Sequence, residues 1–524
     1  MDWVDLIGLA ELQAKGKVVA RQGGRQILLI ATPGGVHACV NRCPHQGYPL
    51  SEGVLSDGGC VLTCNWHNWK FDLKDGRTLV GGDRLRRFPV RIDAGRVLVD
   101  LSPENPVARR QRVLAGVARA LEDQDQERLV RECARLASLP GGMIGAVTTA
   151  VAWAASRLEF GTTHAFAGAP DWLALHDAAG IDADERLAAI GEVLGHIADD
   201  AAGGGVFPFP PGEAPWDEAA FLAAVEAEDE ARAAVLIRGA LSGGLAATDL
   251  APALFTAALS HYADFGHSLI YCVKTLALIR RLGRAAAEPL TLLLVRSLIF
   301  ARREDLLPEF RDYRLRLDEW GQPGRAQPLE SPALRRKSAK SAMALVGAWS
   351  ARHAPEEIFS VLVEAAAWTL LHVDEAALIR TRGKIADNVG WLDFTHAVTF
   401  ADAGLQAARA RPQLWPAVLL QLACFIGRNS AYLDPDADIR RYWATDHDAF
   451  LETATHSLFD HAQEGFIVSV HFIKTLMAAK ALAAEMPDRA AILYAAANRF
   501  LQAPMKRRHV LRTARQMRAF VAQE

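Results

Sequence analysis

The pattern of apolar and polar residues changes character after about residue 105. Before that point, short apolar runs such as Gln26–Ile30 and Val97–Val99 alternate with glycine-rich segments such as Gly23-Gly24 and Gly81-Gly82. Short apolar runs bounded by glycine and aspartate are typical of strands joined by tight turns. The pattern therefore predicts a small antiparallel β domain over residues 1–105.

From residue 106 to residue 524, apolar residues recur at spacings of three and four, and alanine, leucine, glutamate and arginine dominate. This periodicity predicts amphipathic helices. Proline and glycine clusters interrupt it at Pro140–Gly142, Gly203–Pro215 and Gly321–Pro332. We expect a multidomain chain in which the small all-β domain is followed by a large all-α domain of about fifteen helices or more.

The helical region contains two weak internal echoes. At an offset of 200 residues, His261–Leu276 aligns with His461–Leu476, and a lysine falls at the same place in both. In addition, Thr163–Ala165 matches Thr395–Ala397, and each follows shortly after a phenylalanine. Self-similarity of this kind indicates a duplicated helical array.

Composition and charge narrow the class of protein. The chain has 524 residues and a net charge of −3, which gives no reason to expect nucleic acid or an anionic membrane surface as a partner. The opening residues Met1–Trp3 lack the basic segment of a secretory signal, and the most apolar stretch, Met143–Ala155, is too short to span a bilayer. Seven scattered cysteines argue against a disulfide framework, so we expect a cytoplasmic protein.

Two short motifs near the N-terminus carry the clearest chemistry. Cys43-Pro-His45 is followed, after eighteen residues, by Cys64-Asn-Trp-His67. Two thiolates and two imidazoles in matched pairs suit a Rieske [2Fe–2S] cluster, in which the cysteines hold one iron and the histidines hold the other. The alternative is a tetrahedral zinc site, although zinc fingers normally pair cysteine with cysteine and histidine with histidine.

The segments around these motifs, Cys43–Leu50 and Cys64–Asp72, resemble the cluster-binding loops of Rieske ferredoxins and ring-hydroxylating oxygenases. Asn65 and Asn68 stand where those loops usually have proline and glycine, and the four ligands are intact. Neither loop has the extra cysteine that a bridge between loops would need, so the resemblance implies the ferredoxin or oxygenase type. It covers about residues 1–105, and no β-sandwich like that of the oxygenases is evident beyond them.

Four histidines of the helical region stand in more distinctive surroundings than the others: His164, His267, His396 and His471. A lone histidine on a helix is usually a surface or core residue, whereas several imidazoles on neighbouring helices are how helical bundles build non-haem iron sites. The alternative is that these side chains form hydrogen bonds between packed helices.

Helical geometry groups further polar residues with these histidines. If residues 455–476 form one helix, a single face carries His456, Asp460, Glu464, His471 and Lys474. On the corresponding earlier helix, one face carries Asp264, His267, Tyr271 and Lys274. Polar groups inside such apolar helices must be buried with partners or bind something.

These segments resemble the questin oxidase-like family, helical non-haem oxygenases that act on polycyclic aromatic polyketides. Gly266–Tyr271 is similar to the A-H-P-L-I-H segment of that family, with Tyr271 where the second histidine stands. Phe466–His471 is similar to its F-F-L-M-H segment, and Phe160–His164 to its H-N-H segment, with Thr162 replacing a histidine.

The resemblance implies a mononuclear non-haem iron with a set of histidine ligands: His164, His267, His396 and His471. It also implies that a carboxylated lysine, Lys474 or Lys274, is a further ligand. We assign catalytic roles to the remaining polar groups near these positions, which are Lys474, Tyr271 and Asp264.

Together these features predict an oxygenase that contains its own electron-accepting domain. An external NAD(P)H-dependent reductase would reduce the Rieske cluster, which would pass electrons through His45 or His67 to an iron that activates O₂ and oxidises a small organic substrate. No dinucleotide-binding fingerprint is present, so the reductase is expected to be separate. The alternatives are an electron-transfer protein with a helical docking scaffold, or a redox sensor.

The sequence also suggests where an aromatic substrate would bind. Aromatic side chains on the helices are candidates to line an aromatic-accepting pocket: Trp153, Trp172, Trp368, Trp391, Phe394, Phe400 and Phe425.

Overall fold

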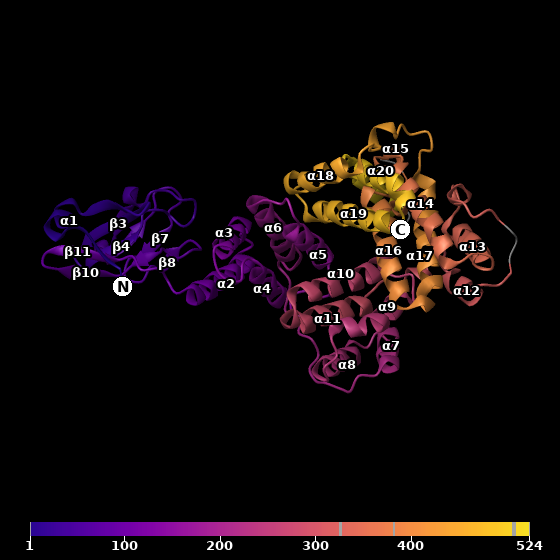
Figure 1. The fold of residues 1–524 in the computed structure, drawn as a ribbon, viewed down its shortest axis with the longest axis horizontal. Helices are drawn as coiled ribbons and strands as arrows, with labels where there is room; N and C mark the ends of the chain where they lie inside the picture. Colours follow the sequence, from indigo (N-terminus) through magenta and orange to yellow (C-terminus); the bar gives the residue numbers. More distant parts are fainter. Residues whose placement is uncertain (1, 324–326, 381–382, 506–509, 523–524) are drawn as a thin grey trace. The chain divides into compact units, whose positions relative to one another are not determined.

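A computed structural model describes residues 2–323, 327–380, 383–505 and 510–522 (Figure 1). The chain divides into two compact units, the β unit (Met1–Ala120) and the helical unit (Leu121–Glu524). The predicted fold class is confirmed, because a small all-β region precedes a large all-α region. The boundary expected after residue 105 coincides with the start of helix α2 (Pro106–Asp123), whereas the two compact units divide within that helix.

Besides most of α2, the β unit contains three antiparallel sheets and one short α-helix, α1 (Leu9–Lys15). The first sheet has the order β1-β11-β10, formed by Trp3–Gly8, Arg96–Asp100 and Val90–Asp93. The second has the order β2-β3-β4-β9, formed by Lys17–Gln22, Arg25–Thr32, Gly35–Val40 and Arg87–Phe88. The third has the order β5-β6-β7-β8, formed by Val54–Ser56, Val61–Thr63, Lys70–Asp72 and Thr78–Val80.

Strand β3 separates two apolar clusters of the β unit. Side chains alternate across a strand, so Leu28 and Ile30 enter one cluster while Ile27 and Leu29 enter the other. All four side chains are fully buried. The first cluster also contains the two motif cysteines, which places the candidate iron ligands at the edge of a packed core.

The helical unit follows the predicted breaks, since no α-helix crosses Pro140–Gly142 or Gly203–Pro215 and no α-helix is described within Gly321–Pro332. After α2, its helices are α3 (Gln126–Ala137), α4 (Ile144–Ala154), α5 (His164–Asp177), α6 (Ala183–Asp200), α7 (Glu218–Glu226), α8 (Glu230–Ser242), α9 (Ala251–Leu259), α10 (His267–Leu282), α11 (Arg284–Ile299) and α12 (Tyr313–Asp318). They continue with α13 (Ala339–Ser350), α14 (Pro355–Leu371), α15 (Glu375–Leu378), α16 (Trp391–Ala410), α17 (Trp415–Asn429), α18 (His447–Ser457), α19 (Phe466–Glu485), α20 (Ala490–Leu501) and α21 (Val510–Val521).

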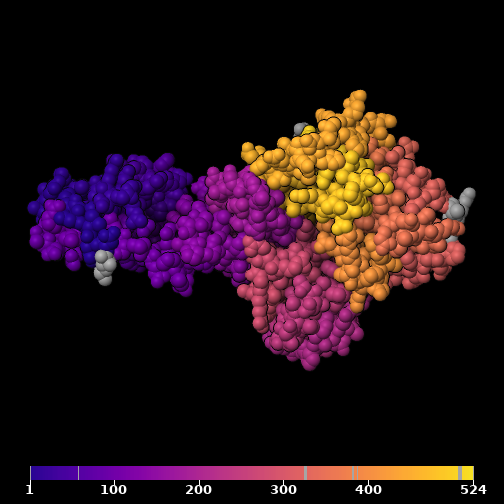
Figure 2. All heavy atoms as spheres, viewed as in Figure 1, coloured from indigo at the N-terminus to yellow at the C-terminus, as the bar shows by residue number. Residues whose placement is uncertain are grey.

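Four helices form a closed ring at the centre of the helical unit. Helix α5 contacts α10 and α19, and α16 contacts the same two helices. The two sequence echoes fall on this ring, one pairing α5 with α16 and the other pairing α10 with α19. At the surface, the C-terminal helices drawn in yellow lie against the orange segments of α14 to α17, in agreement with the contact of α20 with α14 (Figure 2). The internal duplication itself stays a prediction.

Helix α19 is long and apolar enough to cross a membrane by length and composition, with a mean hydropathy of 1.5. The expectation that the most apolar stretch is too short to span a bilayer overlooked this segment. However, 72% of its most apolar window is buried inside the helical unit, which is typical of a core helix.

The predicted continuous helix over residues 455–476 is wrong. Helix α18 ends at Ser457, and α19 begins only at Phe466. Between them, Ala462 has a φ of +51°, a left-handed conformation that interrupts a right-handed helix. The three polar residues expected to share a face with His471 and Lys474 therefore lie outside α19: His456, Asp460 and Glu464.

Candidate metal centres

The two motifs of the β unit lie on two tight loops. The Cys43 backbone N–H donates to the Tyr48 carbonyl at 2.8 Å, and the Gly47 N–H donates back to the Cys43 carbonyl at 2.9 Å. In the second loop, the Cys64 N–H donates to the Trp69 carbonyl at 2.8 Å. Each loop is thus closed on itself by the backbone of the cysteine that would bind iron.

The two asparagines that depart from the usual loop sequence have structural roles. Asn68 has a φ of +58°, and asparagine adopts this left-handed conformation more readily than most residues, so it serves where glycine is usual. Asn65 donates from Nδ2 to the Glu52 carbonyl at 2.6 Å, which ties the second loop to the segment after the first. Both substitutions keep the loop geometry.

The four predicted cluster ligands come together from the two loops. The rings of His45 and His67 are 4.6 Å apart at 77°, while Cys43 and Cys64 are 4% and 1% exposed. Burial raises the pKa of the Cys43 thiol to about 11, so a bound cation is needed to hold the pair as thiolates at neutral pH. Two buried thiols and two facing imidazoles fit a [2Fe–2S] cluster.

The four predicted histidines of the helical unit also come together, in a group that we call the histidine cluster: His164, His267, His396 and His471. They belong to the four helices of the central ring, and each lies in the first two turns of its helix. Ligand atoms of three of them, on α5, α10 and α16, lie within 4.8 Å of one another.

The hydrogen bonds of the histidine cluster fix which ring nitrogens face one another. Nδ1–H of His267 donates to the Asp264 carbonyl, Nδ1–H of His396 to Leu392, and Nδ1–H of His471 to Ile467, each at 2.6 Å. A carbonyl can only accept, so in the neutral ring the lone pair is on Nε2. Backbone carbonyls of this kind commonly orient histidines that bind metals.

The Nε2 lone pairs of His267 and His396 point toward each other, and Nε2 of His164 faces the same point. His267 Nε2 lies 2.9 Å from His396 Nε2 and 3.0 Å from His164 Nε2. Burial, and next the charge of Lys474, lower the pKa of His267 to about 3, so the ring is neutral. If two nitrogens each lie about 2.1 Å from one metal ion and their bonds to it form a right angle, the nitrogens are about 3.0 Å apart. The observed distances between Nε2 atoms match this value.

The His471 ring lies beside the same group of nitrogens, and its Nε2 is available to bind a metal ion. Its ring lies 4.9 Å from that of His164 and 5.2 Å from that of His396, and its buried Nε2 has no hydrogen-bond partner among the described residues. One turn later, Lys474 is fully buried and its Nζ also has no partner in the described part of the chain. Burial, followed by the charge of Lys274, lowers the pKa of Lys474 to about 7.

The two lysines considered as ligands have different surroundings. Lys274 Nζ donates to Asp171 Oδ1 at 2.7 Å, which commits that amine to an ion pair. Lys474 has no such pair, and a largely neutral amine is the form that can react with CO₂ or bind a metal. The structure therefore separates the two candidates, with Lys474 the available one.

The two other residues expected to be catalytic lie beside the histidine cluster. The hydroxyl of Tyr271 is 3.3 Å from His164 Nδ1, and burial raises its pKa, so it stays a phenol. A carboxylate oxygen of Asp264 is 4.0 Å from His267 Nδ1. Asp264 belongs to a short 3₁₀ segment (Asp264–Gly266) in which all three residues have positive φ, of 45°, 53° and 77°.

Gly266 explains why that segment can be so tight. A Cβ at this position would lie 2.6 Å from the Phe425 ring and 2.9 Å from the Phe400 ring. Glycine alone combines this close approach with a positive φ. The packing of two core aromatics thus determines where the first residue of α10, His267, begins.

A cavity of about 480 Å³ adjoins the histidine cluster, within the size range of small-molecule sites. It is bordered by His164 and Tyr271 and by aromatic, acidic and hydroxyl side chains, among them Phe160, Phe300, Phe466, Asp199, Asp200, Asp264 and Thr162. None of the seven aromatic residues predicted for a substrate pocket lines this cavity among the described residues, and five of them are buried in the core: Trp172, Trp391, Phe394, Phe400 and Phe425.

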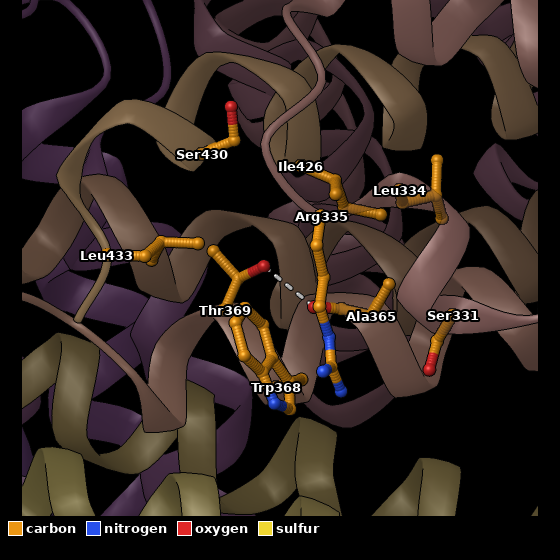
Figure 3. A pocket seen from close by; sticks show the side chains of 9 residues that line it. All are labelled: Ser331, Leu334, Arg335, Ala365, Trp368, Thr369, Ile426, Ser430 and Leu433. Carbon is orange, nitrogen blue, oxygen red and sulfur yellow. Dashed lines mark hydrogen bonds between the residues drawn. The ribbon is translucent and has the colours of Figure 1, made fainter. Parts of the chain in front are cut away.

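One of those seven lines a different hollow. The Arg335 guanidinium lies 4.3 Å from the ring of Trp368 (Figure 3). The His372 ring also stacks with Trp368, with the ring centroids 4.1 Å apart. This hollow has a volume of about 10 Å³, which is room for about one water molecule. It is too small for an organic substrate.

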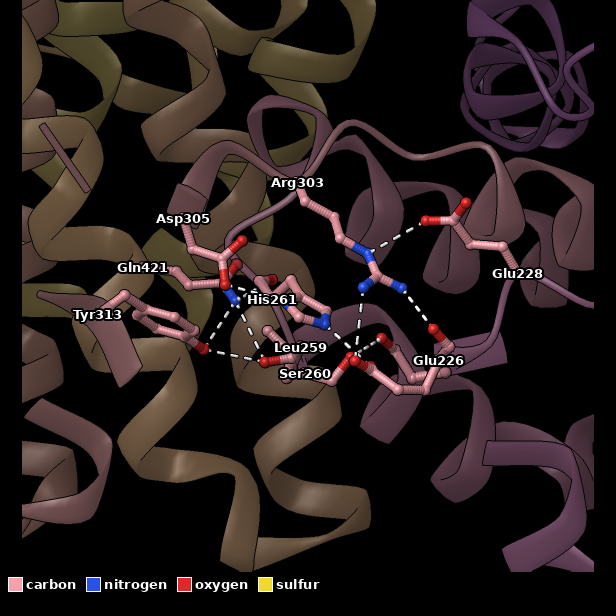
Figure 4. Close-up of polar contacts among 10 residues, drawn as sticks. Glu226, Glu228, Leu259, Ser260, His261, Arg303, Asp305, Tyr313 and Gln421 are labelled. Carbon is pink, nitrogen blue, oxygen red and sulfur yellow. Dashed lines mark hydrogen bonds and ion pairs between the residues drawn. The ribbon is translucent and has the colours of Figure 1, made fainter. Parts of the chain in front are cut away.

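A polar network beside the cavity holds the segment before α10 (Figure 4). His261 Nδ1 lies 2.8 Å from Asp305 Oδ2, and its Nε2 lies 2.9 Å from Glu226 Oε2. Carboxylates only accept, so both ring nitrogens must donate and His261 is an imidazolium. The hydrogen bond to Asp305 is the main reason that the pKa of His261 is raised.

This network predicts a pH dependence of stability. Because the folded pKa of His261 is raised above the ordinary value of 6.5, its contribution is fully present below pH 6.5 and is lost as pH rises through the raised pKa. We expect His261→Gln to lower the free energy of unfolding by about 1–3 kcal/mol at pH 6, and by less at pH 9. Urea unfolding followed by far-UV circular dichroism measures this, and an equal loss at both pH values would contradict it.

Comparisons with known proteins agree with the geometry of the β unit. Residues 2–85 match the family described as Rieske [2Fe-2S] domain. The ferredoxin component of the alkene monooxygenase system of Xanthobacter autotrophicus is 33% identical over 104 residues, which is 20% of this chain and 84% of that protein. The 4beta-methylsterol monooxygenase of Methylococcus capsulatus is 37% identical over 95 residues, which is 16% of this chain and 25% of that protein.

Among solved structures, the terminal oxygenase of carbazole 1,9a-dioxygenase from Nocardioides aromaticivorans IC177 is 28% identical, with a TM-score of 0.19. The match covers 20% of this chain and 31% of that one. The chain therefore spans most of a ferredoxin component but less than a third of the oxygenases that it matches.

Proposed function

Because this chain belongs, through its first 100 residues or so, to the Rieske [2Fe–2S] family, we propose that it is a Rieske-fused non-haem iron oxygenase. In this proposal Cys43, His45, Cys64 and His67 hold the cluster, and the histidine cluster of the helical unit holds a mononuclear iron. The cluster supplies single electrons, and the iron, once bound, supplies O₂ activation.

The observation that carries this proposal is the convergence of imidazole Nε2 atoms whose Nδ1–H groups are already bonded to backbone carbonyls. The two neutral acceptors of His267 and His396, 2.9 Å apart, repel one another unless a cation lies between them, and His164 Nε2 lies 3.0 Å from the first of them. Imidazole suits iron as a ligand, and a lysine amine or its CO₂ adduct at Lys474 would complete the donor set.

The other residues of the site have defined tasks in this proposal. Nδ1–H of His164 donates to the Tyr271 oxygen, which leaves Nε2 of that histidine free to bind iron and the phenol proton free to point into the cavity. Asp264, whose carboxyl pKa is raised by burial, borders the same cavity and can give or take a proton there. Both groups act on the substrate side of the histidine cluster.

The resemblance to the questin oxidase-like family belongs to this proposal, as does an aromatic or polyketide-like substrate. The matched ferredoxin component and the terminal oxygenase are named as parts of multi-protein systems, which supports electron transfer with a partner protein. We therefore propose an external NAD(P)H-dependent reductase as the electron donor and the cytoplasm as the location.

Metal analysis of the full chain tests the proposal. We expect one iron per chain beyond the two of the Rieske cluster, together with O₂ consumption that depends on an added reductase. Iron content and the electron paramagnetic resonance signal of the cluster are measured on the same sample. Only two irons per chain and no other metal would instead favour an electron-transfer protein with a helical docking scaffold.

A further inference from the structure

The side chains that line the cavity beside the histidine cluster favour some classes of organic ligand over others. Its ionisable side chains are Asp199, Asp200 and Asp264 on the negative side and Arg302 on the positive side, besides histidines. Three negative charges against one positive charge leave a formal charge of −2. Burial lowers the pKa of His196, the lining histidine outside the histidine cluster, so it does not offset that charge.

The hydrogen-bonding groups around the cavity include three carboxylates as acceptors, besides the donors of Arg302 and Tyr271. Carboxylates only accept, and Ser297 already donates its hydroxyl to the Leu294 carbonyl at 2.7 Å. Thr162 also lines the cavity, but its hydroxyl oxygen is itself buried and has no hydrogen-bond partner among the described residues.

Apolar contact in the cavity comes from phenylalanine rings. Phe160 and Phe300 are 62% and 50% exposed, and their rings meet edge to face at 5.7 Å. Phe466 stacks on His196 at 5.4 Å and leaves its other surface to the cavity. Phenyl faces attract organic cations, and the attraction strengthens where water is excluded.

From these features we infer that the cavity binds an aromatic or otherwise apolar compound that carries a protonated amine. The ammonium group would donate to the carboxylates of Asp199, Asp200 and Asp264, and the apolar body would contact the phenylalanine rings. This inference rests on the proposed function only in taking the cavity as the substrate site. Binding by itself requires no turnover and no electron donor.

Matched probes test the inference on the full iron-loaded chain. They are 1-naphthylmethylamine, which is a cation at pH 7, its neutral counterpart 1-naphthalenemethanol, and the anion 1-naphthoate. Isothermal titration calorimetry should show the amine binding at least about tenfold more tightly than the alcohol, and the naphthoate most weakly. An alcohol that binds as tightly as the amine, or an amine that does not bind, would overturn the inference.

A charge-removing variant locates the binding site. Asp199→Asn should weaken binding of the amine about 3- to 10-fold and leave binding of the alcohol unchanged, because the Asp199 side chain has no described hydrogen bond to lose. Asp184→Asn makes the same change near the other end of α6, away from the cavity, and should change neither affinity. Equal loss for amine and alcohol would count against the inference. Iron content is measured in parallel, and absence of the third iron would contradict the proposed function, whereas the difference between Asp199→Asn and Asp184→Asn reports on the cavity carboxylate at either iron content.

Discussion

Replacing His267 with alanine should remove the iron of the helical unit and leave the Rieske cluster in place. His267 has the central position, with its Nε2 3.0 Å from His164 and 2.9 Å from His396. Loss of a hydrogen-bonded outer partner of a metal ligand costs about 10- to 100-fold in affinity or activity, and loss of a ligand should cost more. Iron content should fall by one per chain, and substrate oxidation should fall more than about 100-fold.

His372→Ala is the matched control for this variant. Like His396 and His471, His372 is buried, and its Nδ1–H donates to the carbonyl four residues earlier, that of Trp368, at 2.9 Å. It stacks on Trp368 rather than on other imidazoles. The control variant should therefore report any loss of helix stability while its iron content stays unchanged. If His267→Ala keeps its full iron content, the ligand assignment is refuted.

Replacing Cys64 with serine should abolish the visible absorption and paramagnetic resonance of the Rieske cluster. The thiol is 1% exposed in a packed apolar cluster, and a serine hydroxyl is a poor thiolate substitute for iron. Because the β unit and the helical unit are separate compact units, the third iron should remain. Substrate turnover with added reductase should fall to the background rate measured without the reductase.

Cys60→Ser is the control for that experiment. Cys60 is a half-buried free cysteine between the two motifs but in neither loop. Its replacement should leave the spectrum and turnover intact. A Cys64→Ser variant that keeps its cluster signal would refute the ligand set, and zinc in place of iron in the unmodified chain would restore the alternative reading of the motif.

The sequence was sufficient for features that depend on local spacing. The cysteine and histidine pairs of the loops are fixed by positions a few residues apart, and the change from strand to helical periodicity marked the two regions. The convergence of His164 with His396 was less visible, because these residues are far apart in sequence. The sequence signal that linked them was the match between the segments Thr163–Ala165 and Thr395–Ala397.

Other features depend on packing and could not be read from periodicity. The choice of Lys474 over Lys274 depends on Asp171, which pairs with only one of them. The break before α19 was signalled by Gly465, but Ala462 adopts its left-handed φ without a glycine. The cavity residues come from loops and helix ends, where neither the 3.6-residue nor the two-residue pattern applies.

The position of the histidine cluster in the first two turns of four helices has an electrical consequence. The N-terminal end of a helix carries a partial positive charge from unpaired N–H groups, and its effect is confined to about the first turn. His164 and His267 are the first residues of α5 and α10, so two such ends lie at the histidine cluster. A positive potential disfavours the more highly charged state of a bound metal ion and so raises its reduction potential. In the proposed oxygenase, these two helix ends would favour electron transfer from the Rieske cluster to the helical unit.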